Sequence, residues 1–565
     1  MSQLTENASN MLASTTSGTT LLIFVQLASR LFIFGSNQII LRSLSPSILG
    51  IAAQLELLFI SILYFSRESI RTAIQRQPLL RSSAPATSTN KDGASSSEEQ
   101  RQIRSQAESS QSVVNMSYLG VGMGIITGVV FGAFYVRFAS EEVLETPLYH
   151  PSVAVTALAS LIELCSEPFF AVVQQYMLYS KRAAVEISAV FVKSLVTCFT
   201  SIWASWTGRN LGVLPFALGY LSYSLMIFCG YFLAIMPLSR EWQFSFLLSR
   251  ITPSDKVAYV AARWPWTLIL LSANVFFQSI VKHLLTQGDS MILAAMTSLQ
   301  DQGIYSLTSN YGGLVARILF QPIEESSRVI FSSLLSSKGT KDQDASIRAA
   351  KVHLLNVMRG YLIISVLIIP LGPALIPKML HLLGGQRWAV PEVDGLLALY
   401  CYYIPFLAFN GIGEAFVSST ASPADLRRQA AWMGIFSACF VLVAYIFLAV
   451  CEMGARGLVF ANIVNMSVRI VWSFSFVQRY FSQHKFELAL HEFTLRPRTY
   501  AATATITAVL SMMEFRANPY GDLIQLGLGG SYVFLLLHSE RKHIMTHSAK
   551  LYQVLKSKAI RSKID

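Results

Sequence analysis

Residues 26–71 read QLASRLFIFGSNQIILRSLSPSILGIAAQLELLFISILYFSRESIR, and this stretch decides the fold class. It contains two apolar segments of membrane-spanning length. Polar and charged side chains lie within these segments or at their ends: Gln26, Arg30, Asn37, Gln38, Arg42, Gln54 and Glu56. A charged group at the centre of a bilayer costs about 3 kcal/mol or more, so it usually faces a water-filled cavity or a partner. The stretch therefore predicts a membrane protein that moves a polar substrate.

The composition of the whole chain supports this interpretation. Only 13% of the 565 residues are charged and 53% are hydrophobic, whereas soluble proteins carry about a quarter charged residues. Uncharged runs such as 113–136 are long enough to cross the bilayer as helices. We predict an all-α polytopic membrane protein with about 14 spans: 18–42, 47–66, 114–137, 150–177, 183–206, 212–236, 264–296, 303–335, 353–376, 394–420, 430–450, 456–478, 499–513 and 519–538. The span at 264–296 is too long for one straight crossing, and we expect a break near Gly288 and Asp289.

A short repeated motif indicates two parallel halves. The sequence E-S-x-R closes the second predicted span at Glu68–Arg71 and the eighth at Glu325–Arg328. Because the two spans are six apart, they share an orientation in the membrane, as in transporters built from parallel repeats. We predict an N-terminal lobe at 1–238 with a disordered cytoplasmic linker at 78–112, an inter-lobe linker at 239–263, a C-terminal lobe at 264–480, two extra helices at 481–538 and a basic tail at 539–565.

The positive charge is distributed unevenly. The net charge is +12, and Lys and Arg concentrate in alternate connections, including Arg427, Arg428 and Arg479, and in the C-terminal tail. Since cytoplasmic loops carry the excess of Lys and Arg, we predict cytoplasmic termini and no nucleic-acid partner. The basic tail after Ser539 is expected to rest on anionic lipid headgroups. The inter-lobe linker, with Phe246 and Leu247, is expected to lie on the membrane surface or to be an ordinary connection. The cysteines form no C-x-x-C pair, so we expect no metal site and no cofactor.

The ionisable groups within the spans are the candidate functional residues. Guanidinium groups hold phosphate oxygens through paired hydrogen bonds, so Arg30 and Arg317 suit an anionic headgroup. The candidates for substrate binding are Arg30, Arg42, Arg317, Lys282, Gln26, Asn37, Gln38, Asn310 and Tyr311. The candidates for gating or coupling are Glu56, Arg67, Glu68, Arg71, Asp289, Glu324, Glu325, Arg328 and Glu414. An interhelical ion pair that only fixes two spans is the alternative for each of them. No catalytic constellation is present, so we predict no enzyme activity.

Several longer motifs resemble the Rft family of eukaryotic oligosaccharide translocation proteins. In the first half they are Q-L-x-S-R-L at 26–31, N-Q-x-x-L-R at 37–42, L-E-L-L at 55–58 and S-R-E-x-x-R at 66–71. In the second half they are K-H-x-L-T-x-G-D at 282–289, D-Q-G-x-Y at 301–305, N-Y-G at 310–312, A-R at 316–317, P-I-E-E at 322–325 and the run from Tyr400 to Phe416. The similarity extends from about residue 20 to the last predicted span.

The resemblance implies a place in the endoplasmic reticulum membrane and a fourteen-span exporter fold, shared with bacterial lipid II flippases and multidrug extruders. It also implies a substrate, the dolichyl pyrophosphate heptasaccharide of five mannoses and two N-acetylglucosamines, moved from the cytosolic to the lumenal leaflet for N-glycosylation. On this basis Arg30, Arg42 and Arg317 would hold the pyrophosphate, with Lys282 as a further candidate, and the Glu68–Arg71 and Glu325–Arg328 contacts would form gates. The alternatives are a protein that binds the lipid-linked sugar, or organises its glycosyltransferases, without moving it, and a small-molecule antiporter.

Overall fold

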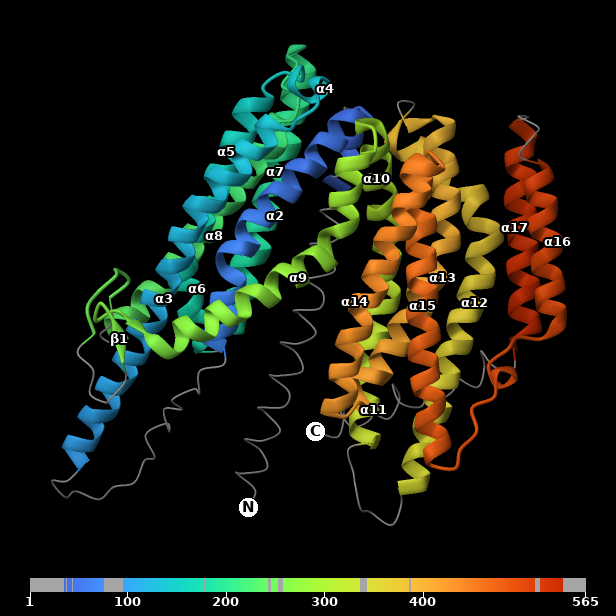
Figure 1. The fold of residues 1–565 in the computed structure, drawn as a ribbon. Coiled ribbons are helices and arrows are strands. Elements are labelled where there is room, and N and C mark those ends of the chain that lie inside the picture. The colour runs from blue at the N-terminus through green and yellow to red at the C-terminus, as the bar shows by residue number, and fades with distance from the viewer. Residues whose placement is uncertain are drawn as a thin grey trace, which may run out of the picture. The chain divides into compact units, whose positions relative to one another are not determined.

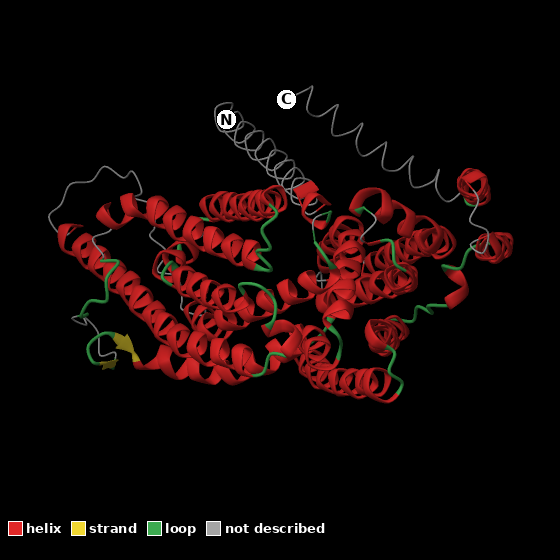
Figure 2. Ribbon diagram, turned by 90° about the horizontal axis from the view of Figure 1, so that it is seen from above, coloured by secondary structure: helices red, strands yellow, loops and turns green. Residues whose placement is uncertain are grey.

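The computed structural model describes residues 35–36, 38–42, 44–75, 95–176, 178–241, 245–251, 258–335, 343–385, 388–513 and 519–541. These residues are almost entirely helical, with one two-stranded hairpin (Figure 2). They form two compact units, one ending at Met291 and the other beginning at Ile292. Each unit is described by itself.

The N-terminal unit is a bundle of long apolar helices (Figure 1). Its elements are α2 (Pro46–Gln75), α3 (Ser95–Arg137), α4 (Glu141–Leu144), α5 (Tyr149–Leu164), α6 (Glu167–Gln175), α7 (Tyr179–Thr207), α8 (Leu214–Glu241), the hairpin β1 (Tyr259–Val260) and β2 (Trp264–Pro265), and most of α9 (Trp266–Met296). Aromatic side chains fill much of its core. Phe169 packs edge to face with Phe228 and Phe232 at centroid distances of 5.7 and 5.5 Å, a favoured geometry for aromatic pairs.

The C-terminal unit is also helical. It contains α10 (Leu299–Val315), the π-helical turn η1 (Ala316–Phe320), α11 (Gln321–Leu335), α12 (Gln343–Gly384), α13 (Pro391–Thr420), α14 (Pro423–Tyr445), the π-helical turn η3 (Ile446–Val450), α15 (Gly454–Gln483), the short η4 (Leu490–Glu492), α16 (Pro497–Met513) and α17 (Pro519–Ser539). Elements α10, η1 and α11 follow one another without a gap. Isolated π-turns within α-helices often mark functional positions, and η1 contains Arg317.

The predicted spans agree well with these helices. Every span from 47–66 to 519–538 falls on a helix or on consecutive helices, whereas most of 18–42 lies outside the described residues. Among the described residues, nine helices are long and apolar enough to cross a membrane, or ten if the bent pair α5 and α6 forms one span. The chain is therefore an all-α polytopic membrane protein. The count of fourteen and the lobe boundaries stay predictions.

Two local predictions are wrong. The expected break near Gly288 is absent, because α9 continues as one α-helix from Trp266 to Met296. The linker predicted to be disordered at 78–112 is helical from Ser95 onward, since α3 begins there. An unpredicted bend of 41° instead separates α5 from α6. Pro168 lies in the first turn of α6, where the missing N–H costs nothing because that turn has no intrahelical acceptor for it.

The segment after α8 is fastened to α3. The side-chain amide of Asn115 donates to the carbonyls of Ser249 and Arg263 at 2.8 and 2.9 Å, and its carbonyl oxygen accepts from the N–H of Ser249. The indole of Trp264 donates to the backbone carbonyl of Asn115 at 2.9 Å. Phe246, in the segment expected to lie on the membrane surface or to be an ordinary connection, packs on Phe169 with a centroid distance of 5.0 Å. The segment is thus part of the N-terminal unit's packing.

The last two helices are attached to α12 along its length. The guanidinium of Arg359 pairs with Glu540 at 2.9 Å, and Lys378 pairs with Asp522 about five turns further along α12. Between these two contacts the hydroxyl of Tyr532 donates to the carbonyl of Val366 at 2.6 Å. The extra helices α16 and α17 therefore belong to the packed C-terminal unit.

Candidate functional site

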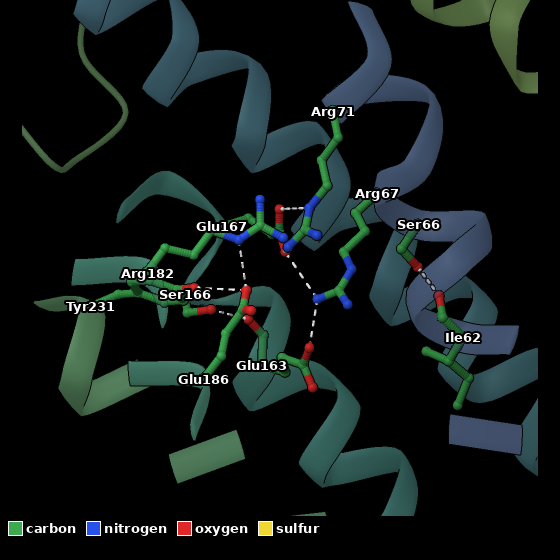
Figure 3. A network of polar contacts seen from close by, with 10 residues as sticks. All are labelled: Ile62, Ser66, Arg67, Arg71, Glu163, Ser166, Glu167, Arg182, Glu186 and Tyr231. Atoms are coloured by element: carbon green, nitrogen blue, oxygen red, sulfur yellow. Dashed lines mark hydrogen bonds and ion pairs between the residues drawn. The ribbon is translucent and has the colours of Figure 1, made fainter. Parts of the chain in front are cut away.

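The most extensive buried charge cluster of the described residues joins α2 to the bend between α5 and α6. Nη1 of Arg67 lies 2.6 Å from Glu163 and 3.1 Å from Glu167 (Figure 3). Arg71 holds Glu167 with two nitrogens, Nε at 2.8 Å and Nη2 at 2.5 Å. Both carboxylates are almost completely buried, with 5% and 4% of their side chains exposed. A two-nitrogen contact of this kind is strong and directional.

Helix periodicity explains this geometry. Arg67 and Arg71 are four residues apart on α2, and Glu163 and Glu167 are four apart across the α5–α6 bend. Side chains at this spacing lie on one helix face, so two cations face two anions. The hydroxyl of Ser166 donates to the carbonyl of Glu163 at 2.6 Å, which satisfies a backbone acceptor where the helix is interrupted.

Aromatic contacts extend the cluster to α7 and α8. The ring of Phe170 has the guanidinium of Arg71 3.8 Å from its centroid and that of Arg182 5.1 Å away, distances typical of cation–π contacts. Arg182 pairs with Glu186 at 2.8 Å, and the hydroxyl of Tyr231 donates to the same carboxylate at 3.2 Å. Helices α2, α5, α6, α7 and α8 therefore each contribute a side chain to this cluster, part of which Figure 3 shows.

The cluster neutralises itself. It contains three guanidinium groups and three carboxylates: Arg67, Arg71, Arg182, Glu163, Glu167 and Glu186. Desolvated charges are tolerated where partners compensate them, and removing one partner of a buried pair is strongly destabilising. One polar atom of the cluster is unsatisfied: Oε2 of Glu163 is buried without a hydrogen-bond partner among the described residues. The geometry assigns the cluster primarily to holding α2, α5 and α6 together.

The candidate gate residues of the first half therefore have other partners than expected. The predicted contact within the Glu68–Arg71 pair is replaced, since Arg71 binds Glu167 and Glu68 accepts from Lys282 of α9 at 2.9 Å. Next to Lys282, the imidazole of His283 is buried and lies 3.0 Å from the hydroxyl of Ser61. These contacts attach α9 to α2 within the N-terminal unit. Glu56 is exposed on α2.

The candidate gate residues of the second half are arranged around α11 and α13. Glu414 pairs with Arg469 of α15. Glu325 accepts from the amide of Gln321 at 3.1 Å, and the backbone carbonyl of Arg328 accepts from Ser419 of α13. The carboxylate of Glu324 occupies the space that a side chain at position 411 would need, so any other residue there would force Glu324 to move. The expected Glu325–Arg328 contact stays a prediction.

The predicted substrate-binding residues are placed only in part. Arg30, Gln26 and Asn37 lie outside the described residues, as does the side chain of Arg317. Arg42 is exposed in the turn before α2, and Gln38, Asn310, Tyr311 and Asp289 each have a contact of their own. Lys282 is 64% exposed. Among the described residues no group of His, Cys, Asp and Glu side chains is arranged to hold a metal ion.

The roles of Glu163 and Glu167 as partners of Arg67 and Arg71 were missed by sequence reasoning, and Arg182 was not selected. A signal for the first was present in the matched spacing of the two pairs. Another lay in Ser166-Glu167-Pro168, because a proline directly after a polar residue marks a helix start. Which helices pack together cannot be read from one sequence, so the ion pairs between α2 and the α5–α6 bend could not be predicted.

Comparison with known structures identifies the class of fold. The lipid II flippase MurJ in an inward closed conformation superposes with a TM-score of 0.55 at 12% identity, covering 93% of this chain and all of that one. An inward-facing multidrug resistance MATE family transporter gives 0.50 at 13% identity, with 78% and 93% covered. The chain therefore shares the all-helical fold of these two proteins.

The sequence comparisons are more specific. The Rft protein family model matches residues 14–550. The Man(5)GlcNAc(2)-PP-dolichol translocation protein RFT1 of Yarrowia lipolytica is 34% identical, over 98% of this chain and 83% of that protein. The protein of the same name from Saccharomyces cerevisiae is 32% identical, over 85% of each chain. This chain belongs to the Rft family.

Proposed function

We propose that this chain moves Man(5)GlcNAc(2)-PP-dolichol from the cytosolic to the lumenal leaflet of the endoplasmic reticulum membrane, and that it does so without enzymatic activity. The observation that carries the proposal is the 34% identity, over almost the whole chain, to a protein named for this translocation. The polytopic fold supports it, because moving a lipid-linked sugar requires a route for a polar group through the hydrocarbon core.

In the proposed mechanism the two halves alternate in opening toward each side of the membrane. Arg30, Arg42 and Arg317 hold the pyrophosphate, since guanidinium groups bind phosphate oxygens in pairs, and Lys282 adds a further charge. Lys282 pairs with Glu68 at 2.9 Å, so in this mechanism the phosphate competes with Glu68 for its ammonium group. Arg317 lies in the π-turn η1, and because such turns often mark functional positions, this supports its assignment to the pyrophosphate. The sugar passes beside these charges, while the dolichol stays in lipid.

The buried cluster on α2, α5 and α6 has a different part in this mechanism. Its charges already compensate one another, so it serves as a rigid element of the N-terminal half. The gating contacts then fall to the more exposed Glu68–Lys282 pair and to the carboxylates Glu324, Glu325 and Glu414.

Both termini lie on the cytoplasmic side, and glycosyltransferases of the N-glycosylation pathway are candidate partners.

The test is reconstitution of the purified chain in vesicles with a labelled lipid-linked heptasaccharide, followed by measurement of the label exposed on each leaflet. Arg30→Ala and Arg317→Ala should slow the transfer at least about tenfold, because each removes a charge-assisted contact to phosphate. Arg498→Gln, a substitution of an exposed arginine on α16, is the matched control and should transfer at the wild-type rate. Unchanged transfer in both alanine variants contradicts the assignment of the phosphate site. Binding of the lipid without any transfer by the wild-type chain favours the non-transporting alternative.

A further inference from the structure

A small cavity lies between α14 and α15 in the C-terminal unit. Its volume is about 110 Å³, and it is lined by Asp425, Arg428, Trp432, Trp472, Ser475, Phe476 and Arg479. Pockets for drug-sized ligands measure roughly 300 Å³ or more. The cavity therefore admits a headgroup or a single ionic group, but not an oligosaccharide.

The charge of the cavity is positive. Arg428 and Arg479 are both exposed, and in the described part of the chain neither forms an ion pair within 4 Å. The one carboxylate, Asp425, is committed to the start of α14, where it accepts from the N–H and hydroxyl of Ser422 at 3.1 and 2.6 Å. These hydrogen bonds, and to a smaller extent the two arginine charges, lower the pKa of Asp425. Two guanidinium groups thus remain for an anion, and phosphate is the group they match best.

The aromatic walls place this cavity at the membrane–water interface. Trp432 and Trp472 are half-buried and are held by stacking, Trp432 on Phe436 at 5.9 Å and Trp472 on Phe476 at 6.3 Å. Tryptophans concentrate at the level of lipid headgroups. The apolar span of α14 begins at Arg427, so the cavity lies where this helix enters the hydrocarbon.

The adjoining surface suits acyl chains. Ile435 and Leu442 on α14 are 54% and 60% exposed, and Val471 on α15 is 66% exposed. An amphiphile whose phosphate occupies the cavity can thus lay its chains along apolar side chains of the same two helices. A soluble phosphate compound gains nothing from this surface. An apolar surface beside a cationic cavity therefore favours a lipid over a free ion.

We propose that the cavity between α14 and α15 binds the phosphate of an anionic phospholipid in one leaflet, with Arg428 and Arg479 as ligands and Trp432 and Trp472 as the interfacial walls. From the positive-inside pattern this is the cytosolic leaflet. The site is independent of lipid-linked sugar translocation, because phospholipid binding can be measured without any transfer.

The test uses the full chain in nanodiscs that contain equal amounts of phosphatidylcholine and phosphatidylglycerol, followed by native mass spectrometry of the lipids that stay bound. The wild-type chain should retain phosphatidylglycerol preferentially, because its phosphate is its only charge, whereas the choline ammonium of phosphatidylcholine compensates the phosphate. The double variant R428Q/R479Q should lose this preference by about tenfold, since both charge-assisted contacts are gone. R427Q is the matched control, because it removes the neighbouring exposed charge outside the cavity and should keep the preference.

Three results would overturn the proposal: an unchanged preference in R428Q/R479Q, an equal loss in R427Q, or displacement of the bound lipid by glycerol phosphate at equal concentration, which would assign the cavity to soluble phosphates. If the double variant does not fold, R479Q replaces it, because this side chain lies exposed at the end of α15. It should reduce the preference measurably, and an unchanged preference in this folded variant would also overturn the proposal.

Discussion

The two units of this protein both contain ion pairs between helices, but they use them in different ways. In the N-terminal unit, Glu163 and Glu167 are buried within the helix bundle and share Arg67 and Arg71. In the C-terminal unit the ion pairs are separate: Glu540 and Glu492, which lie outside the long helices, hold Arg359 and Lys351 of α12, and Glu414 of α13 pairs with Arg469 of α15. The difference teaches that an ionisable residue in an apolar sequence is not by itself a sign of a substrate route. Its burial and the number of its partners decide how much of its role is structural.

The largest effect should come from Glu167. Glu167→Gln removes the carboxylate that binds both Arg67 and Arg71, and leaves guanidinium charge without compensation in a buried site. We expect a loss of about 3 kcal/mol or more in the free energy of unfolding. Denaturation of the purified protein in one fixed detergent, followed by tryptophan fluorescence, measures it.

The pair variant Arg71→Met/Glu167→Leu is the control for this prediction. It removes both members of the contact and leaves no uncompensated guanidinium on α2, because Arg67 keeps Glu163, so it should be more stable than Glu167→Gln alone. If Glu167→Gln unfolds at the wild-type denaturant concentration, the cluster does not hold the N-terminal unit together.

The next largest effect should come from Glu540. Only 1% of this side chain is exposed, and the carboxylate accepts from Arg359, from the N–H of Arg496 and from the hydroxyl of Thr499. Glu540→Gln should cost about 2 kcal/mol, because charge-assisted hydrogen bonds are replaced by neutral ones. The same unfolding measurement tests it, and Arg541→Gln provides a neighbouring exposed control. Equal losses in the two variants would contradict a specific role for Glu540.

A smaller effect is expected for Glu492, and it should depend on pH. The hydrogen bond from Lys351, at 2.9 Å, is the main cause that lowers the pKa of this carboxyl group. A lowered pKa in the folded state means that the contribution is present above the unfolded value, about 4.3, and is lost as the pH falls through the folded value. The stability difference between wild type and Glu492→Gln, about 1 kcal/mol or less at neutral pH, should disappear on acidification. A difference that persists at low pH would contradict this assignment.

The smallest effect on stability should come from Lys282. This side chain is 64% exposed and its partner Glu68 is 29% exposed, and exposed ion pairs contribute about 1 kcal/mol or less. Lys282→Gln should therefore unfold almost as the wild type does, while it slows translocation if the amine contacts the phosphate or the gate. A variant that is clearly destabilised would show instead that Lys282 stabilises the fold.

Much of the fold was predictable because long apolar runs specify membrane helices directly. The exceptions have local physical reasons. Gly288 does not break α9, since a single glycine inside a helix costs only about 1 kcal/mol, and α9 continues through it as one helix of 31 residues. The α5–α6 bend follows from Pro168, a signal present in the sequence but not used. The helical start of α3 at Ser95 was hidden by a polar composition typical of linkers.

The candidate site was less predictable. Sequence reasoning selected Arg67, Arg71 and Glu68 as ionisable residues within or beside spans, but it paired Glu68 with Arg71 on the same helix and gave Arg67 no partner. The structure gives them partners on other helices, Glu163, Glu167 and Lys282. Contacts between distant segments depend on how helices pack, which periodicity within one helix does not contain. Family similarity, carried by motifs such as Lys282–Asp289, supplied the substrate class that no single residue indicated.

The most direct test of the central claim is the rate of transbilayer movement of the lipid-linked heptasaccharide in vesicles of synthetic lipid that contain the purified wild-type chain and no other protein. The account predicts transfer that is faster than in protein-free vesicles and that increases with the amount of chain incorporated. Transfer at the protein-free rate, with the chain folded and the lipid bound, would contradict it.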